Sequence, residues 1–425
     1  MDQVQEKNGY TAATNFDRQF PRCNPLMFTT LVHRFLCGSL LVLLAVSAPH
    51  CSAAEPVSTT MPAKIRVATF NVSLYGTKPG EVYERLIDGR DPQAIRLAAI
   101  VQTVRPDVLL VNEIDYEPTA ATARLLAEEY FAIAKSGRSS IEYPYIYAAP
   151  SNTGIDSGLD LNGNATHGEA TDAWGYGVYP GQYSMAIFSR FPIDQKNIRS
   201  FQHFLWSELP AAKRPCDPET QKPYYEDRVW SKLRLSSKNH LDVPIQIGDA
   251  TIHLLASHPT PPVFDGAEDR NGCRNHDEIR FWLDYIDNPD AVYLRDDHGN
   301  TGGLATDAAF VIVGDLNADP ADGDGRQDAI CRLLDHVRVQ DPQPRSTGAA
   351  EQTAKNNANA KHVGDPALDT ADFGSSGHFR VDYVLPSSQL NVINAGVFWP
   401  RRQDPQRELI SASDHRLVWV EVEVP

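Results

Sequence analysis

The chain has 425 residues, of which 42% are hydrophobic and 22% are charged. This composition excludes an intrinsically disordered, collagen-like or coiled-coil protein. With 39 basic and 55 acidic residues, the formal net charge is −16. Proteins that hold a nucleic-acid backbone through their own charge usually carry the opposite sign. A phosphate ester could still be bound if a divalent cation supplied positive charge locally.

An N-terminal apolar run is typical of a targeting signal. Residues 35–48 read FLCGSLLVLLAVSA, follow Arg34 and precede the small residues at 52–54. This is the three-part layout of a secretory signal peptide, and the run is short for a transmembrane helix. Met27 is a better candidate for the start of the signal than Met1, because the segment before it is long and polar.

Two alternatives remain for this segment, namely an uncleaved membrane anchor and a lipoprotein signal at Cys51. The second fits poorly, since Pro and His precede Cys51 where a lipobox has small residues. We therefore predict a signal peptide and leader over residues 1–54 and one domain over 55–425. The mature protein is expected to be secreted or periplasmic, without stable insertion in a membrane.

Cleavage at this point would leave three cysteines, Cys216, Cys273 and Cys331. An oxidising compartment permits one disulfide and one remaining thiol. Cys216 and Cys273 are the preferred pair because both lie in loop-like sequence, whereas Cys331 lies in a helical pattern and is expected to be buried. No CxxC spacing occurs, which excludes zinc-knuckle and thioredoxin-type sites.

Apolar runs rich in strand-forming residues recur along the rest of the chain, with turn residues between them. They cover residues 65–72, 107–114, 183–189, 229–235, 243–247, 251–257, 309–313, 381–385 and 417–424. Several are continuous, as in strands covered on both faces. The last alternates valine with acidic residues, as in an edge or half-exposed strand.

Helical patterns lie between some of these runs. Asp91 followed by Pro92 predicts a helix start. Asn275 with Glu278 resembles a capping box, and a third apolar stripe begins at Ile330. Strands that alternate with such helices indicate a layered α/β domain. Its predicted long loops cover residues 148–182, 205–228, 260–275 and 341–378.

Polar residues that can bind a metal interrupt or end the predicted strands at six places. They are Asn71; Glu113; His258; Asp315 with Asn317; Asp382; and Asp414 with His415. Polar groups at strand ends of α/β sheets converge on one crevice. The oxygen ligands could hold a hard cation, and two histidines remain for proton transfer. Each residue alone has an ordinary explanation, such as a turn or a strand-end hydrogen bond, but the agreement at all six places favours a site.

The sequence motifs around these residues resemble those of the endonuclease/exonuclease/phosphatase superfamily, the DNase I-like metal-dependent phosphoesterases. The matching stretches are VATFNV (67–72), VLLVNEID (108–115), YSMAIFSRFPI (183–193), LLASHP (254–259), VIVGDLNADP (311–320), RVDYVLP (380–386) and SASDH (411–415). The resemblance implies a four-layer α/β/β/α sandwich of two packed mixed sheets. It also implies phosphoester hydrolysis with Mg²⁺, or with Mn²⁺ or Ca²⁺ in its place.

The resemblance assigns the metal to three residues. Glu113 resembles the principal metal carboxylate, Asn71 lies beside it, and Asp414 resembles a ligand of the metal or of its water. Two positions depart from the pattern, because Ser73 stands where some nucleases have aspartate and Asn112 stands where glutamine is common. These departures weaken what the resemblance implies about the substrate, but not what it implies about the type of reaction.

The resemblance assigns the proton chemistry to five further residues. His415 resembles the catalytic histidine, and Asp382 the aspartate that orients it. Asp315 and Asn317 resemble the pair that positions the attacking water and steadies the phosphoryl group. His258 stands where abasic-site endonucleases carry a tyrosine, which argues against that branch.

Two loop features have weaker functional interpretations. Asp160, Asn162 and Asn164 have the alternate spacing of a structural Ca²⁺ loop, although an ordinary Gly/Asn-rich loop explains them as well. The aromatic cluster over residues 174–179 could stack against a base or another flat group, or simply pack the loop.

These observations predict an exported, divalent-metal-dependent phosphoesterase that hydrolyses phosphodiester or phosphomonoester bonds. An extracellular nuclease is one candidate. The alternatives are a phospholipid-headgroup (sphingomyelinase-like) hydrolase and a catalytically inactive binding module on the same scaffold. The expected partner is a phosphoester substrate, whether nucleic acid, phospholipid headgroup or small phosphate ester, and the sequence implies no protein partner.

Overall fold

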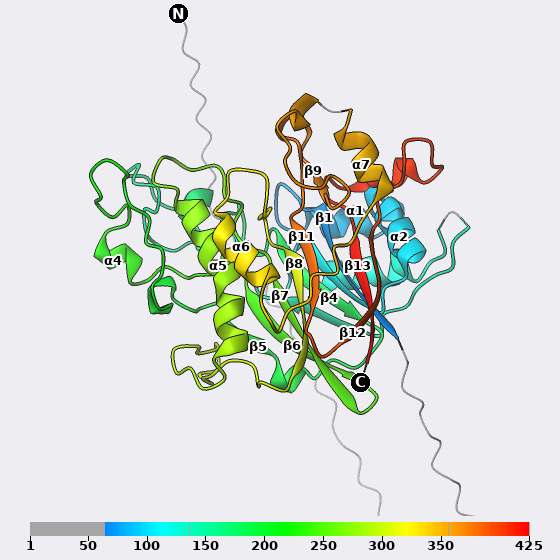
Figure 1. Cartoon of the computed structure of the whole chain (residues 1–425), viewed down its shortest axis with the longest axis horizontal. Coiled ribbons are helices and arrows are strands. Elements are labelled where there is room, and N and C mark those ends of the chain that lie inside the picture. Colours follow the sequence, from blue (N-terminus) through cyan, green and yellow to red (C-terminus); the bar gives the residue numbers. More distant parts are fainter. Residues whose placement is uncertain (1–63, 136, 356, 425) are drawn as a thin grey trace, which may run out of the picture. The chain divides into compact units, whose positions relative to one another are not determined.

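The computed structural model describes residues 64–135, 137–355 and 357–424. The predicted signal peptide over 35–48 lies outside these residues. No helix within them is long and apolar enough to cross a membrane. Their strands form two large mixed sheets and one small two-stranded sheet (Figure 1).

The first sheet has six strands and contains one parallel pair, β1 with β2. Its strands in spatial order are β12 (Asn391–Val397), β13 (Val418–Glu423), β1 (Ile65–Leu74), β2 (Val108–Ile114), β4 (Ser184–Ser189) and β3 (Tyr145–Ala149). All its other neighbours are antiparallel.

The second sheet has five strands, again with one parallel pair, β7 with β8. Its order is β11 (Asp382–Pro386), β8 (Ala309–Asp315), β7 (Ala250–Ser257), β6 (His240–Ile247) and β5 (Arg199–Ser200). The small sheet pairs β9 (Ala371–Asp372) with β10 (His378–Phe379).

Helices cover the outer face of each large sheet. The first is covered by α1 (Glu81–Leu86), α2 (Pro92–Val104), α3 (Ala121–Leu125) and a π-helical turn (Leu126–Phe131). The second is covered by α5 (Arg270–Asp287) and α6 (Gln327–Leu334). Two shorter helices, α4 (Asp227–Trp230) and α7 (Thr347–Thr353), lie in connecting segments.

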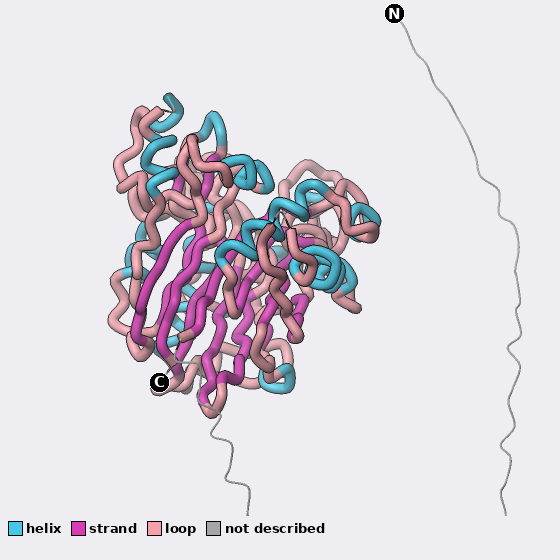
Figure 2. The backbone as a smooth tube through the Cα atoms, turned by 90° about the vertical axis from the view of Figure 1, so that its right-hand side faces the viewer, coloured by secondary structure: helices cyan, strands magenta, loops and turns pink. Residues whose placement is uncertain are grey.

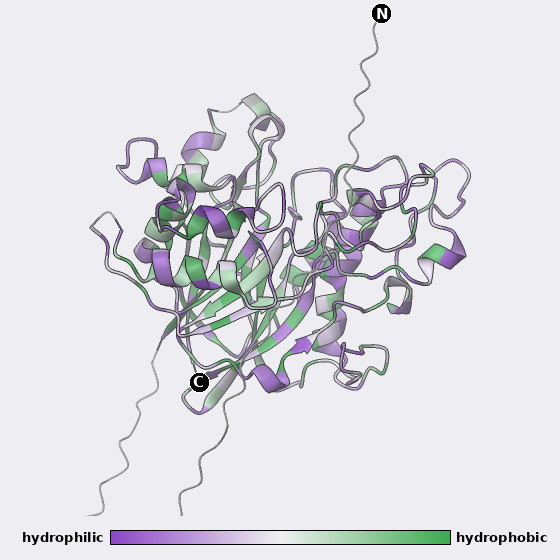
Figure 3. Ribbon diagram, turned by 180° about the vertical axis from the view of Figure 1, so that it is seen from behind, coloured by the Kyte–Doolittle hydropathy of each residue, from purple (hydrophilic) through white to green (hydrophobic). Residues whose placement is uncertain are grey.

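Three buried clusters show the four layers. One joins α2 to the first sheet, one joins α5 and α6 to the second, and the third lies between the sheets. In the third, Val67 and Ile187 of the first sheet pack in the same cluster as Val243 and Val311 of the second. The α/β/β/α sandwich is therefore confirmed, with strands in the middle (Figure 2) and hydrophobic residues concentrated along them (Figure 3).

Most of the predicted strands are present, and one is wrong. Residues 229–235 form the end of α4 and a turn, because the amide groups of Val229 and Trp230 both donate to the Glu226 carbonyl. Their leucines still reach the core, from a turn instead of a strand. The last strand, β13, has the predicted half-exposed face, but it lies between β12 and β1 and is not an edge.

The predicted capping box at Asn275 and Glu278 is also wrong, because α5 begins five residues earlier, at Arg270. Both residues lie within the helix, and their side chains are fully buried. The Asn275 side-chain amide donates to the Thr260 carbonyl, and the Glu278 carboxylate accepts from the Thr260 backbone amide. The two residues therefore hold the segment that follows β7 in place. The helix start at Asp91 is confirmed, since its carboxylate accepts from an amide in the first turn of α2.

The preferred Cys216–Cys273 disulfide is not formed, and Cys216, Cys273 and Cys331 are all free thiols. Cys273 lies in α5 and packs in the core beneath the second sheet, which a loop assignment did not anticipate. Cys331 is helical as predicted but only half-buried.

A fully buried histidine, His240, lies at the start of β6. Its Nε2–H donates to the Glu278 carbonyl at 2.8 Å, and its Nδ1 lies 3.0 Å from the Ser236 hydroxyl, so the neutral ring is satisfied on both sides. Burial lowers the pKa of His240 to about 4. As the pH falls, His240 is therefore protonated in the unfolded chain before it is protonated in the folded chain.

We predict that this group contributes stability that is present above pH 6.5 and is lost as the pH falls toward 4. The loss should be on the order of 2 kcal/mol between pH 7 and 4.5, and smaller in His240→Gln. Urea unfolding across this range measures it, with the exposed His298→Gln as control. An unchanged pH slope in His240→Gln would contradict the assignment.

Candidate active site

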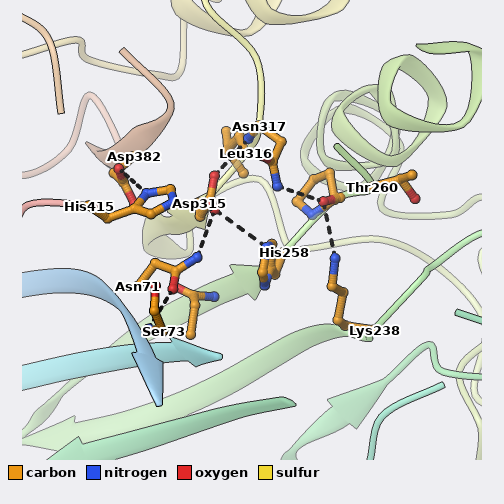
Figure 4. A network of polar contacts seen from close by, with 12 residues as sticks. Asn71, Ser73, Lys238, His258, Thr260, Asp315, Leu316, Asn317, Asp382 and His415 are labelled. Carbon is orange, nitrogen blue, oxygen red and sulfur yellow. Dashed lines mark hydrogen bonds and ion pairs between the residues drawn. The ribbon is translucent and has the colours of Figure 1, made fainter. Parts of the chain in front are cut away.

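Six of the eight predicted site residues come together at one end of the interface between the two sheets (Figure 4), namely Asn71, His258, Asp315, Asn317, Asp382 and His415. Asn71 lies in β1, and its side-chain amide donates to Asp315, the last residue of β8 in the opposite sheet, at 3.0 Å. His415 lies three residues before the start of β13 in the first sheet and binds Asp382 of β11 in the second. Polar contacts therefore cross from one sheet to the other at this end.

Two buried carboxylates lie directly opposite each other in the second sheet. Asp315 and Asp382 are Cα partners across the antiparallel β8–β11 pair, and each is 1% exposed. Like charges at such positions repel, and burial strengthens the repulsion. A cation close to both carboxylates is needed for the two to be ionised together.

His415 provides that cation. Its Nδ1 lies 2.9 Å from Asp382 Oδ2 and its Nε2 lies 3.6 Å from Asp315 Oδ2. Burial acts against the charged ring, but the two carboxylates outweigh it and raise the pKa of His415 to about 10. At neutral pH the proton therefore lies on the imidazole.

Thr370 fixes the carboxylate of Asp382. The threonine hydroxyl donates to Asp382 Oδ2 at 2.8 Å and accepts the backbone amides of Val381 and Asp382. Burial raises the pKa of Asp382 to about 6, against the influence of His415. The sequence offered no signal for Thr370, since it lies in a long irregular segment before β9.

Asp315 is held by groups from several elements. It accepts from the Asn71 amide, from the backbone amide of Asn317 at 2.9 Å, and faces His258 Nε2 at 3.4 Å. Burial alone would raise the pKa of Asp315, but His415 and His258 hold it well below its usual range. The side-chain amide of Asn317 is turned to the Pro259 carbonyl.

The approach of β8 to β7 before Asp315 requires a glycine. Gly314 has φ 153°, and a Cβ there would lie 2.0 Å from the carbonyl oxygen of Ser257. The glycine in the Gly-Asp-Leu-Asn motif thus allows close strand packing next to Asp315.

His258 is buried, and its Nδ1 has no hydrogen-bond partner among the residues the structure describes. Because Nε2 faces a carboxylate, that nitrogen carries the proton and Nδ1 keeps a free lone pair. Burial and then the charge of Lys238 lower the pKa of His258. The surroundings of the two histidines therefore raise the pKa of His415 and lower the pKa of His258.

Glu113 and Asp414, unlike most of the predicted site residues, are not fully buried, and both lie near Tyr75. Glu113 follows a register shift in β2, has φ 59° and is half-buried. Asp414 is exposed and accepts from the Ser73 hydroxyl at 2.6 Å. After burial, the charges of Glu113 and Asp414 both raise the pKa of Tyr75, so both carboxylates face that hydroxyl group.

The donor set fits a divalent cation. Among the described parts of the chain, Asp315, Asp382 and His415 form one group of potential ligands whose atoms lie within 4.8 Å of one another, although the charged His415 ring would have to lose its proton before it could bind a metal. This group differs from the predicted metal residues Glu113, Asn71 and Asp414. Glu113 makes no hydrogen bond or ion pair with any described residue, and it leaves a carboxylate available as the hard oxygen ligand that such ions prefer.

The second predicted metal site, the loop at Asp160, is held by its own contacts. Asp160 accepts the backbone amides of Gly163, Asn164 and Ala165, and the Asn162 and Asn164 amides donate to Glu169. These bonds suit the ordinary loop interpretation, and structural Ca²⁺ here stays a prediction.

Comparison with known proteins identifies one family. A family model described as Endonuclease/Exonuclease/phosphatase family matches residues 68–415. No curated protein matches the chain.

Three solved structures illustrate what the chain is similar to. An endonuclease/exonuclease/phosphatase from Beutenbergia cavernae DSM 12333 is 18% identical, with 85% of this chain and 72% of that chain covered and a TM-score of 0.47. TDP2 from Caenorhabditis elegans is 16% identical, with 85% and 74% covered and a TM-score of 0.41. The human Nocturnin catalytic domain with bound sulfate is 12% identical, with 87% and 99% covered and a TM-score of 0.41.

Proposed function

Because the chain belongs to the Endonuclease/Exonuclease/phosphatase family, a family of phosphoester hydrolases, we propose that it is an exported, divalent-metal-dependent phosphoesterase. It hydrolyses phosphodiester or phosphomonoester bonds. One observation carries the proposal: His415 lies between the buried carboxylates of Asp382 and Asp315, within reach of both.

His415 is the proton donor in this proposal. Its position between two carboxylates keeps the ring charged, and Asp382 accepts the Nδ1 proton, which leaves Nε2–H as the group that can reach a substrate oxygen. A leaving-group oxygen that receives this proton departs as an alcohol instead of an alkoxide. Asp382 orients the ring, and Thr370 orients Asp382.

His258 and Asp315 act on the attacking water. Asp315 is a poor proton acceptor because its pKa is low, so it orients groups around it. His258 is neutral and carries a free Nδ1 lone pair, which makes it the better acceptor of a proton from water. Two titratable groups with opposite shifts are the usual arrangement of an acid and a base in one site.

Glu113 holds the metal in this proposal, with Asn71 and Asp414 beside it. A bound divalent cation neutralises a non-bridging phosphoryl oxygen and stabilises the charge that develops there. Asn71 also fixes Asp315 through its amide, so it connects the metal side of the site to the proton-transfer side.

The first prediction concerns the proton donor. His415→Gln and Asp382→Asn should each lower kcat by roughly 10²–10⁴, the usual size of a general acid contribution. Hydrolysis of a dinucleotide and of glycerol phosphate with Mg²⁺ measures this for a diester and a monoester, because their alkoxide leaving groups need a proton. Bis(p-nitrophenyl) phosphate and p-nitrophenyl phosphate, whose phenolate leaves without one, should lose much less activity. The exposed His298→Gln should keep full activity.

Two outcomes of this assay would reject the proposal. Activity on the dinucleotide and on glycerol phosphate that survives His415→Gln would remove His415 as the donor. Absence of turnover on all four compounds, on DNA, on RNA and on a sphingomyelin-type lipid would favour the inactive binding module, whereas turnover of the lipid alone would favour the headgroup hydrolase.

The second prediction concerns the metal. EDTA should abolish activity, and Mg²⁺ should restore it. Glu113→Gln should raise the Mg²⁺ concentration for half-maximal rate at least tenfold, because it removes the carboxylate that has no other partner. Glu142→Gln, at an exposed glutamate, is the matched control. A wild-type metal requirement in Glu113→Gln would contradict the assignment.

The third prediction concerns export. The full chain with a C-terminal tag should appear outside the cytoplasm with a new N-terminus near residue 55, because residues 35–48 have the layout of a cleaved signal. Deletion of 35–48 should retain the protein in the cytoplasm. N-terminal sequencing decides between cleavage and a retained anchor, which would show an intact N-terminus in the membrane fraction.

A further inference from the structure

A cavity of about 510 Å³ opens beside the catalytic cluster. Its wall includes Glu113, Tyr183 and His258, so it is continuous with the site described above. From there it extends toward Trp206 and Tyr225, away from His415. This volume is in the range of cavities that enclose a small organic ligand.

Aromatic rings form much of the cavity wall. They come from Tyr176, Tyr183, Trp206, Tyr225 and Phe264. The side chains of Phe264 and Tyr176 belong to different loops and are 89% and 60% exposed, which is unusual for apolar rings. Rings at the mouth and within the cavity provide flat surfaces against which another planar group can stack.

The cavity is locally positive in a protein of net charge −16. Lys238, Arg270 and Arg274 line it, and Glu113 is the one carboxylate among its lining residues. Both arginines have partners already, because Arg270 pairs with Glu268 and Arg274 donates to backbone carbonyls.

Lys238 differs from the two arginines. It is 7% exposed, and its ammonium group has one hydrogen bond, to the Pro259 carbonyl at 3.5 Å, and no ion pair among the residues the structure describes. An ammonium group has three N–H donors, and a buried cation with two of them unpaired is costly unless a ligand or water pairs them. In Figure 4 the Lys238 nitrogen lies on the far side of His258 from Asp315.

We propose that this cavity binds the part of the substrate next to the scissile phosphate, and that Lys238 binds a second anionic group there. This inference rests on the proposed phosphoesterase function. The substrates are small phosphate esters that carry a flat ring and a further phosphate, of which a nucleotide is the simplest example. Lys238 is then a specificity residue that contacts substrate, not the reacting atoms.

The charge of the cavity also disfavours one rival substrate class. A phosphocholine-type headgroup would place a quaternary ammonium near Lys238, Arg270 and Arg274, and aromatic rings alone would have to offset that repulsion. A second phosphate instead gains two charge-assisted hydrogen bonds from Lys238.

Binding of ADP, adenosine and phosphocholine to the full chain, measured by titration calorimetry in EDTA, tests this inference. We expect ADP to bind at least tenfold more tightly than adenosine, and phosphocholine not to bind. Lys238→Met should lower ADP affinity at least tenfold and leave adenosine unchanged, Lys238→Arg should restore part of the loss, and the exposed Lys196→Met should match the wild type.

Phe264→Ala provides a second variant that does not depend on a buried position. It should weaken ADP and adenosine equally, because stacking is shared by both. Equal affinity for ADP and adenosine, wild-type ADP affinity in Lys238→Met, tighter binding of phosphocholine, or binding of oligonucleotides only would each overturn the inference.

The same protein separates this inference from the proposed function. ADP binding that depends on Lys238, without turnover of any phosphoester in Mg²⁺, would uphold the cavity assignment and reject the enzyme. Turnover of bis(p-nitrophenyl) phosphate without ADP binding would do the reverse.

Discussion

The arrangement of the candidate site depends on two buried aspartates that face each other across β8 and β11. Asp315 and Asp382 would repel each other in the second sheet alone, so the pair is tolerated only with a cation between them. That cation, His415, comes from the segment that leads into β13 of the first sheet, and Asn71 in β1 of that sheet adds a hydrogen bond to Asp315. Packing of the two sheets therefore assembles the site, and the charge of the site in turn fixes how the sheets meet at this end.

The location of the site could be predicted from sequence because its residues follow uninterrupted apolar strands. In β8, five apolar residues precede Gly314 and Asp315. A polar side chain that follows such a buried strand is expected at the end of the sheet, where it can meet solvent or other polar groups. What joins these residues could not be predicted. Asp382 and His415 are 33 positions apart, and only the tertiary structure brings them within hydrogen-bond distance.

Errors in the sequence-based predictions arose where side chains serve tertiary contacts. Asn275 and Glu278 have the spacing of a helix cap, but they are buried in α5 and bind Thr260, two residues after His258 of the candidate site. Local pattern cannot distinguish these two uses of the same spacing. The strand β12 was missed for the opposite reason. Two asparagines and a glycine interrupt its apolar residues and most of it is exposed or half-buried, so it shows no continuous apolar run and is recognised as a strand only by its pairing with β13.

The acidity of the whole chain and the cations of one cavity act over different distances. Net charge is felt across the surface and repels a long polyanion as it approaches, whereas a buried ammonium such as Lys238 acts on a group that has already entered. Burial lowers the pKa of Lys238, and the nearby carboxylates of Glu278, Glu113 and Asp315 raise it. An anion in contact would replace the hydration that the group has lost. This balance favours a small anion, which can enter the cavity completely. A polyanion would remain in contact with the acidic surface, which repels it.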